Sequence, residues 1–180
     1  VSLRVRTARI LMAALFLAVG LLCAPQARAL SVLQQFYVPL PETQLRQSFL
    51  TLASGTGTTF QAIVSITVAI PGTVIVYDQW EDGYETDINN HVQASTKIWG
   101  DGNNANGIAP GFANDPAGLA EGAVLALRNQ VTLPRNAATF LYDGRDRIGA
   151  TRSVSVSRAG WADTPGSVLA GSIEMYSTVD

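Results

Sequence analysis

Hydrophobic and polar residues alternate along much of the chain. The clearest alternation covers residues 58–70, where Phe60, Val64 and Ile66 belong to the apolar set and the residues between them are largely polar. A period of two places the two sets on opposite faces of a β-strand, so this segment is predicted to be a half-buried strand. Residues 73–77 are again apolar, and Pro71-Gly72 separates the two runs. The sequence therefore predicts a β-hairpin here.

Other short β-type segments are separated by turn residues. Residues 31–40 predict a first strand at a sheet edge, because Pro39 and Pro41 cannot donate to a β-ladder. Residues 42–52 fit either one or two helical turns or a strand. Further strands are predicted within the ranges 95–99, 123–133, 138–142, 149–159 and 167–179. About eight short strands with no long amphipathic helix predict an all-β fold, either a β-sandwich or a jelly roll with long acidic and Asn-Gly loops.

The first 29 residues have a different pattern. Three arginines precede an apolar run at residues 10–23, and Ala27-Arg28-Ala29 then supplies a small-x-small cleavage site. This arrangement is typical of a secretory signal peptide, and the apolar run is shorter than the roughly 20 residues that span a bilayer. We therefore expect cleavage after Ala29, a secreted or cell-surface location, and no membrane span in the mature chain.

Residues 30–180 are expected to form a single β-sandwich domain. The chain stops at Asp180 inside what looks like a continuing strand, so the domain is expected to be truncated at its C-terminal end. The lone cysteine, Cys23, lies in the predicted signal peptide, which leaves the domain without disulfides. A packed core or a bound metal must stabilise it instead.

Charge argues against nucleic acid as a partner. Four of the twelve basic residues lie in the signal peptide, which leaves eight against fourteen acidic residues. Lys97 is the only basic residue between Arg46 and Arg128, whereas a protein that tracks a phosphate backbone needs clustered lysine and arginine. The expected partner is instead an extracellular protein or a glycan, whose identity the sequence does not reveal.

The most distinctive stretch is residues 78–87, where an apolar run changes into a cluster of acids and aromatics. Ca²⁺ is a hard cation that binds six to eight oxygens from carboxylates, amides and carbonyls on flexible loops. The acids of this stretch and the loop at 101–107 predict a Ca²⁺ site. Its candidate ligands are Asp78, Glu81, Asp82, Glu85, Asp87, Asp101 and Asn103. The alternative is a solvated acidic turn with Trp80 and Tyr84 packed on the sheet.

The loop at 101–107 resembles a Ca²⁺ loop only in part. Its third oxygen ligand, Asn106, and its glycine, Gly107, come one residue later than in an EF-hand, and Phe112 stands where the bidentate glutamate would be. An ordinary loop rich in asparagine and glycine is the alternative interpretation. Residues 143–147 mix acids and arginines in a turn, which predicts a solvated turn, an inter-strand ion pair or a contact with a partner.

Enzymatic chemistry is less well supported by the residue types. A carboxylate pair with aromatic platforms is what a glycoside hydrolase uses, and a lectin surface shows the same residues. Nucleophilic catalysis lacks its usual groups, because His91 is the only histidine and no Gly-x-Ser-x-Gly motif occurs. We therefore expect a protein without enzymatic activity, with a lectin or glycoside hydrolase that uses the loop at 78–87 as the alternative.

Several segments together resemble the amino-terminal, β-rich region of large secreted microbial surface proteins of uncharacterised function. They are Phe-Tyr-Val-Pro-Leu-Pro at 36–41, Tyr-Asp-Gln-Trp-Glu-Asp-Gly-Tyr-Glu at 77–85, Trp-Gly-Asp-Gly at 99–102, Ala-Thr-Arg at 150–152, Ser-Arg-Ala-Gly-Trp at 157–161 and Thr-Pro-Gly-Ser-Val-Leu-Ala-Gly at 164–171. The opening Phe-Tyr-x-Pro segment is also similar to IgGFc-binding-type extracellular domains. These resemblances imply export and a structural or adhesive β module, and they carry no catalytic residues with them.

Overall fold

The computed structural model describes residues 31–45, 47, 59–132, 141–162 and 173–176. The predicted signal peptide lies outside these residues, as do the last four residues of the chain. Within them, no helix is long and apolar enough to cross a membrane.

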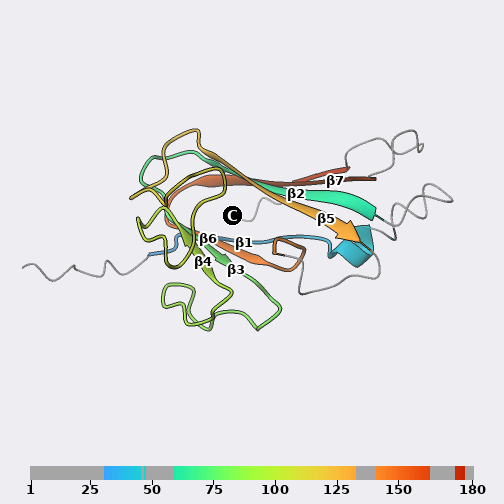
Figure 1. Cartoon of the computed structure of the whole chain (residues 1–180), viewed down its shortest axis with the longest axis horizontal. Helices are drawn as coiled ribbons and strands as arrows, with labels where there is room; N and C mark the ends of the chain where they lie inside the picture. The colour runs from blue at the N-terminus through green and yellow to red at the C-terminus, as the bar shows by residue number, and fades with distance from the viewer. Residues whose placement is uncertain (1–30, 46, 48–58, 133–140, 163–172, 177–180) are drawn as a thin grey trace, which may run out of the picture.

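The described residues form two antiparallel sheets. The first sheet has the strand order β1-β6-β3-β4, from β1 (Gln34–Tyr37), β6 (Arg147–Ala150), β3 (Ile75–Asp78) and β4 (Lys97–Trp99). The second has the order β5-β2-β7-β8, from β5 (Val124–Thr132), β2 (Thr59–Val68), β7 (Val154–Ala162) and β8 (Ile173–Tyr176). The sheets form two layers (Figure 1). The predicted all-β sandwich is confirmed, and so is the position of β1 at a sheet edge.

The core lies between the two layers and follows from the period of two. Ile75 and Tyr77 of β3 face Val64 and Ile66 of β2 in one cluster of buried side chains, and Trp99 of β4 belongs to the same cluster. Alternate residues on each strand share a face, so one apolar set from each of β2, β3 and β4 points into this cluster. Burial of this apolar set is what holds the two sheets together.

The predicted hairpin between residues 58–70 and 73–77 is wrong. β2 pairs with β5 and β7 in the second sheet, whereas β3 pairs with β4 and β6 in the first. The connecting segment crosses from one layer to the other, and its turn is hydrogen-bonded to residue Leu119 rather than across a hairpin: Gly72 N donates to Leu119 O at 2.8 Å. Both strands carry apolar faces that fit opposite sides of one core, which a hairpin within one sheet would not satisfy.

The run predicted as a strand at 149–159 is also divided between the two sheets. It comprises the end of β6 and most of β7, which belong to different sheets and are separated by residues 151–153. The segment 123–133, by contrast, contains one continuous strand, β5, and the short strand predicted at 95–99 is confirmed as β4. Residues 42–45 and 47 are helical, which settles the first part of the 42–52 segment.

The outer face of the first sheet is covered by the connection between β3 and β4. Val76 and Ile98 point away from the core cluster, yet they are 0% and 1% exposed. Ile88 of the connection packs where a side chain on Gly149 would lie, since a Cβ there would be 2.6 Å from Ile88 Cδ1. Figure 1 shows this connection, in green, on the side of the first sheet that faces away from the second. The acidic stretch is therefore part of a cover over the sheet.

Candidate metal site

Asp78, at the end of β3, lies beneath this cover. The strand register places it beside Arg147 of β6, and Arg147 in turn lies beside Tyr37 of β1. Arg147 donates from Nη2 and Nε to Asp78 Oδ2, at 2.6 and 2.8 Å. Desolvation raises the pKa of Asp78 even against the opposing effect of the Arg147 guanidinium. This is the inter-strand ion pair that the mixed charges at 143–147 predicted as one of three alternatives.

Glu85 fixes the path of the cover. Its Oε1 accepts hydrogen bonds from Val92 N at 2.8 Å, Gln93 N at 2.7 Å and Thr96 Oγ1 at 2.9 Å. Desolvation by itself would raise the pKa of Glu85, but these hydrogen bonds to the charged form outweigh it and leave the pKa lowered. Glu85 therefore acts as a charged anchor for the turn that follows it.

Four more of the predicted ligands take part in local hydrogen bonds on the surface. Asp82 accepts from Ser95 Oγ at 2.6 Å, and Asp87 accepts from Asn89 N at 2.9 Å. Asp101 and Asn103 each accept from a backbone N–H two residues further along the chain, at 2.9 and 3.1 Å. These contacts are typical of side chains that cap turns. The structure does not bring these four residues into one group with Glu81.

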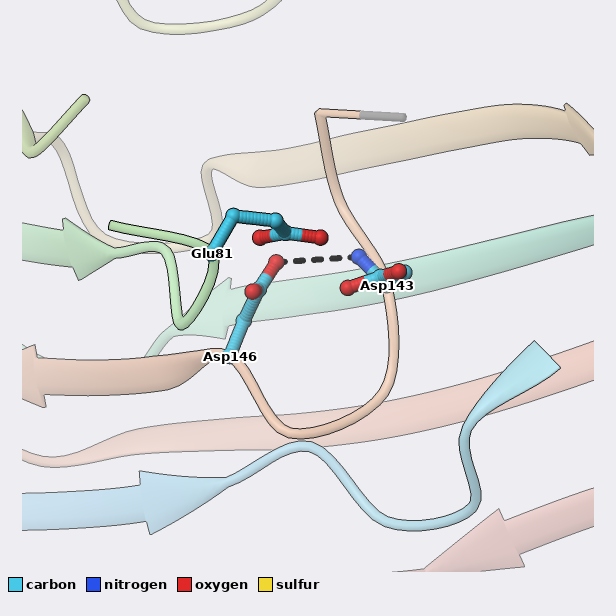
Figure 2. A group of neighbouring side chains, drawn as sticks. All are labelled: Glu81, Asp143 and Asp146. Carbon is cyan, nitrogen blue, oxygen red and sulfur yellow. Dashed lines mark hydrogen bonds between the residues drawn. The ribbon is translucent and has the colours of Figure 1, made fainter. Parts of the chain in front are cut away.

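Glu81 instead joins two acids that lie far from it in the sequence. Glu81, Asp143 and Asp146 each offer a carboxylate oxygen, and these oxygens all lie within 4.8 Å of one another. Figure 2 shows the three carboxylates turned toward a common point, Glu81 from the β3–β4 connection and both aspartates from the turn before β6. Asp143 and Asp146 are 2% and 1% exposed, whereas Glu81 is on the surface. This group can hold a metal ion.

Hydrogen bonds hold the two buried aspartates in place. Asp146 Oδ2 accepts from Tyr77 Oη at 2.6 Å and from Asp143 N at 2.9 Å. Asp143 Oδ1 accepts from Trp80 Nε1 at 3.1 Å, and Trp80 N donates to Asp146 Oδ1 at 3.3 Å. Trp80 therefore contacts both aspartates, and its position immediately before Glu81 brings the third carboxylate to the group.

The turn that carries Asp143 and Asp146 contacts residues 40–42, which lie about a hundred residues earlier in the sequence. Gly144 N donates to Glu42 Oε2 at 3.1 Å, and Glu42 forms a fully buried ion pair with Arg158 of β7. A side chain at residue 144 would overlap the backbone of Leu40 and Pro41, so only glycine fits there. These contacts bury a turn whose sequence alone is compatible with exposure to solvent.

Electrostatics at Asp146 are unusual. Burial is the largest influence, and together with the nearby Glu81 and Glu42 carboxylates it raises the pKa of Asp146 to about 8, against the hydrogen bonds from Tyr77 and Trp80. The hydrogen-bond donors to Asp146 within the described part of the chain are a phenol and two backbone amides, none of them a cation. Near neutral pH this carboxyl group therefore needs either a proton or a bound cation to balance it.

Sequence reasoning missed three important carboxylates. Asp143 and Asp146 were expected in a solvated or ion-pairing turn. Nothing in the local sequence indicates that the fold brings them close to Trp80 and Glu81. Asp115 was not singled out at all, although its carboxylate accepts hydrogen bonds from four backbone amides: Gly100, Asp101, Gly102 and Ala109. This carboxylate orders the long loop at 100–118. The Asn114-Asp115-Pro116 turn was the only local signal.

The chain was compared with known protein families, curated proteins and solved structures. No protein-family model, curated protein or solved structure matches the chain.

Proposed function

We propose that the chain is a non-enzymatic extracellular β module with a structural or adhesive role, stabilised by Ca²⁺ bound to Glu81, Asp143 and Asp146. The convergence of these three carboxylates carries the proposal. Two oxygens bound to one Ca²⁺ at about 2.4 Å are at most about 4.8 Å apart, so the separation of the oxygens fits a shared ion. Backbone carbonyls and water would complete the coordination.

Burial favours a structural role for this site over a catalytic one. Asp143 and Asp146 are almost completely enclosed, so a bulky substrate would reach only the Glu81 side of the group. A bound ion would join the β3–β4 connection to the turn before β6, two segments about sixty residues apart in the sequence. Such a link takes the place of the disulfides that this chain lacks.

The thermal unfolding of chelated protein, measured with and without added Ca²⁺, tests the proposal. Binding to the folded state alone stabilises by about 2.7 kcal/mol when free Ca²⁺ is 100 times its dissociation constant, so the melting temperature should rise. Glu81→Gln should lose most of this rise. Asp82→Asn removes the neighbouring surface acid, which lies outside the group, and should keep it. No rise in the wild type, or an equal rise in both variants, would overturn the site.

Terbium luminescence is a second experiment that tests the same site. Tb³⁺ occupies Ca²⁺ sites and is excited by a nearby indole, and Trp80 Nε1 is 3.1 Å from Asp143 Oδ1. We expect sensitised emission that excess Ca²⁺ removes and that Trp80→Phe weakens. Emission that is unchanged in Trp80→Phe would place the ion elsewhere.

A carbohydrate-binding surface is a second candidate, favoured by one observation. Tyr37 and Tyr84 are 50% and 41% exposed, and their rings pack edge to face with centroids 5.7 Å apart. Exposed aromatic rings beside polar groups are typical of sugar-binding sites. Binding of simple sugars, followed by nuclear magnetic resonance in the wild type and in Tyr84→Ala, tests this candidate. A hydrolase is less well supported, because Asp143 and Asp146 are almost completely enclosed and a sugar chain would reach only Glu81.

A further inference from the structure

The loop between β4 and β5 contains a reactive peptide unit at Asn106 and Gly107. Asn106 is the one asparagine of the sequence that glycine follows. Glycine has no Cβ to shield its backbone nitrogen, and none of the hydrogen bonds of the described residues uses Gly107 N. The conformation also requires glycine, because Gly107 has a φ of 146° and a Cβ there would lie 3.2 Å from Trp99 Nε1. The nitrogen of residue 107 is therefore free to react.

The Asn106 side chain is held by one of its two polar atoms. Its Nδ2 donates to Asp101 Oδ2 at 2.7 Å, while its Oδ1 is buried and has no hydrogen-bond donor. Nothing in the described structure stabilises the amide oxygen in its present form, although the residue itself is partly exposed to water. Both reactants of an intramolecular attack, the side-chain amide and the following backbone nitrogen, are thus present in one partly exposed turn.

We infer that Asn106 is a site of spontaneous deamidation. Gly107 N attacks Asn106 Cγ and forms a new C–N bond, and the bond from Cγ to Nδ2 breaks. Nδ2 leaves as ammonia with the proton that Gly107 N gives up. Water then opens the resulting five-membered imide at either carbonyl and yields aspartate or isoaspartate. No oxidant or reductant takes part.

The modification changes the interactions of the loop. A carboxylate at residue 106 replaces a hydrogen-bond donor next to Asp101, so an attractive contact becomes a contact between like charges. Isoaspartate also converts the Asn106 main-chain carbonyl, which accepts from Ile98 N at 3.3 Å, into a free carboxylate. Ile98 belongs to β4, so the product loosens the loop at its attachment to the first sheet. This consequence is independent of any cation at Glu81.

Ageing of the folded protein at mildly alkaline pH tests the inference. Trypsin cleaves after Lys97 and Arg128, so one peptide contains Asn106 together with Asn103, Asn104 and Asn114 as internal controls. Peptide sequencing by mass spectrometry should show conversion at Asn106 roughly tenfold or more faster than at the other three. Modification that begins at another asparagine would overturn the inference. So would an intact Asn106 after the same time in which urea-unfolded protein has reacted.

The variant Asn106→Gln provides a matched control. Glutamine keeps the amide, but its longer side chain cannot form the five-membered imide. Once its melting curve shows that it folds, this variant should lose the early modification and leave the slower conversion at Asn103 and Asn104 unchanged. Early modification of the same peptide that persists in Asn106→Gln would contradict the assignment.

Discussion

Two groups of acids include residues from the segment 78–85, and the fold surrounds the two groups differently. Asp78 and Glu85 are buried with dedicated donors: the Arg147 guanidinium for one, and two backbone amides with a threonine hydroxyl for the other. Glu81 lies beside Asp143 and Asp146, so that three carboxylates come together. The first group, together with its donors, forms a latch that holds the β3–β4 connection on the sheet, and the second is the group that can hold a metal ion. Acid-rich sequence alone does not distinguish these two outcomes.

The largest effect on the latch is expected from removal of the Arg147 guanidinium, which pairs with Asp78. Arg147→Met leaves Asp78 buried without its ion-pair partner, which costs about 3 to 5 kcal/mol. Urea unfolding measures the loss, and Arg152→Met, which removes an exposed arginine, serves as the control. If Arg147→Met unfolds at the same urea concentration as Arg152→Met, then the ion pair does not latch the connection.

Glu85→Gln probes the second anchor and its dependence on pH. Hydrogen bonds to a charged acceptor contribute about 1.5 to 3 kcal/mol, so this variant should be less stable than the wild type at neutral pH. The pKa of Glu85 is lowered in the folded state, so its contribution is present above the ordinary value of 4.5 and is lost as pH falls through the folded pKa. Urea unfolding at a series of pH values should therefore show the difference between wild type and variant shrinking in acid. A difference that grows in acid would contradict the sign.

Tyr84→Phe should have a smaller effect, because Tyr84 lies at the rim of the latch. The change removes the hydrogen bond from Tyr84 Oη to Arg145 O at 2.6 Å and keeps the ring, which the Arg147 guanidinium approaches to 5.4 Å. The expected loss is about 0.5 to 1.5 kcal/mol, at the lower end because the group is partly exposed. Thermal unfolding measures it, with Tyr37→Phe as a comparison on the same surface. A loss of stability as large as that of Arg147→Met would show that Tyr84 contributes as much as Arg147 to holding the β3–β4 connection on the sheet.

The smallest change is expected from Glu81→Gln in chelated protein. Removal of this acid relieves repulsion within the group, since the Glu81 charge contributes to the raised pKa of Asp146. The metal-free variant should therefore be as stable as the wild type or slightly more stable, as judged by urea unfolding. A clear loss of stability without any cation would show that Glu81 belongs to the latch and not to the second group.

The strands were predictable from the sequence, but their partners were not. The period of two in residues 58–70 identified β2, and Pro39 with Pro41 identified an edge strand. Pro71-Gly72 is a good turn in either geometry, and nothing local states whether the next strand pairs beside β2 or crosses to the other layer. That choice depends on contacts with Leu119, which lies almost fifty residues later.

The same limit applies to the candidate site. The acidic stretch drew attention to the correct segment, yet only Glu81 of the predicted ligands lies in the group that can hold an ion. Asp78 and Glu85 accept hydrogen bonds from donors that are distant in the sequence or follow a turn. These donors come close because of the strand register and because the chain returns at 92–96. Asp143 and Asp146 approach Trp80 because Gly144 fits against Leu40 and Pro41, a contact that no local pattern indicates.

Anomalous diffraction from a crystal grown with Tb³⁺ would show whether Glu81, Asp143 and Asp146 hold one cation. We expect an anomalous peak within coordination distance of a carboxylate oxygen from each of the three residues, and no such peak in crystals of Glu81→Gln. A peak at Asp87 or Asp101 instead, or carboxylates of Asp143 and Asp146 that share a proton with no peak beside them, would contradict it.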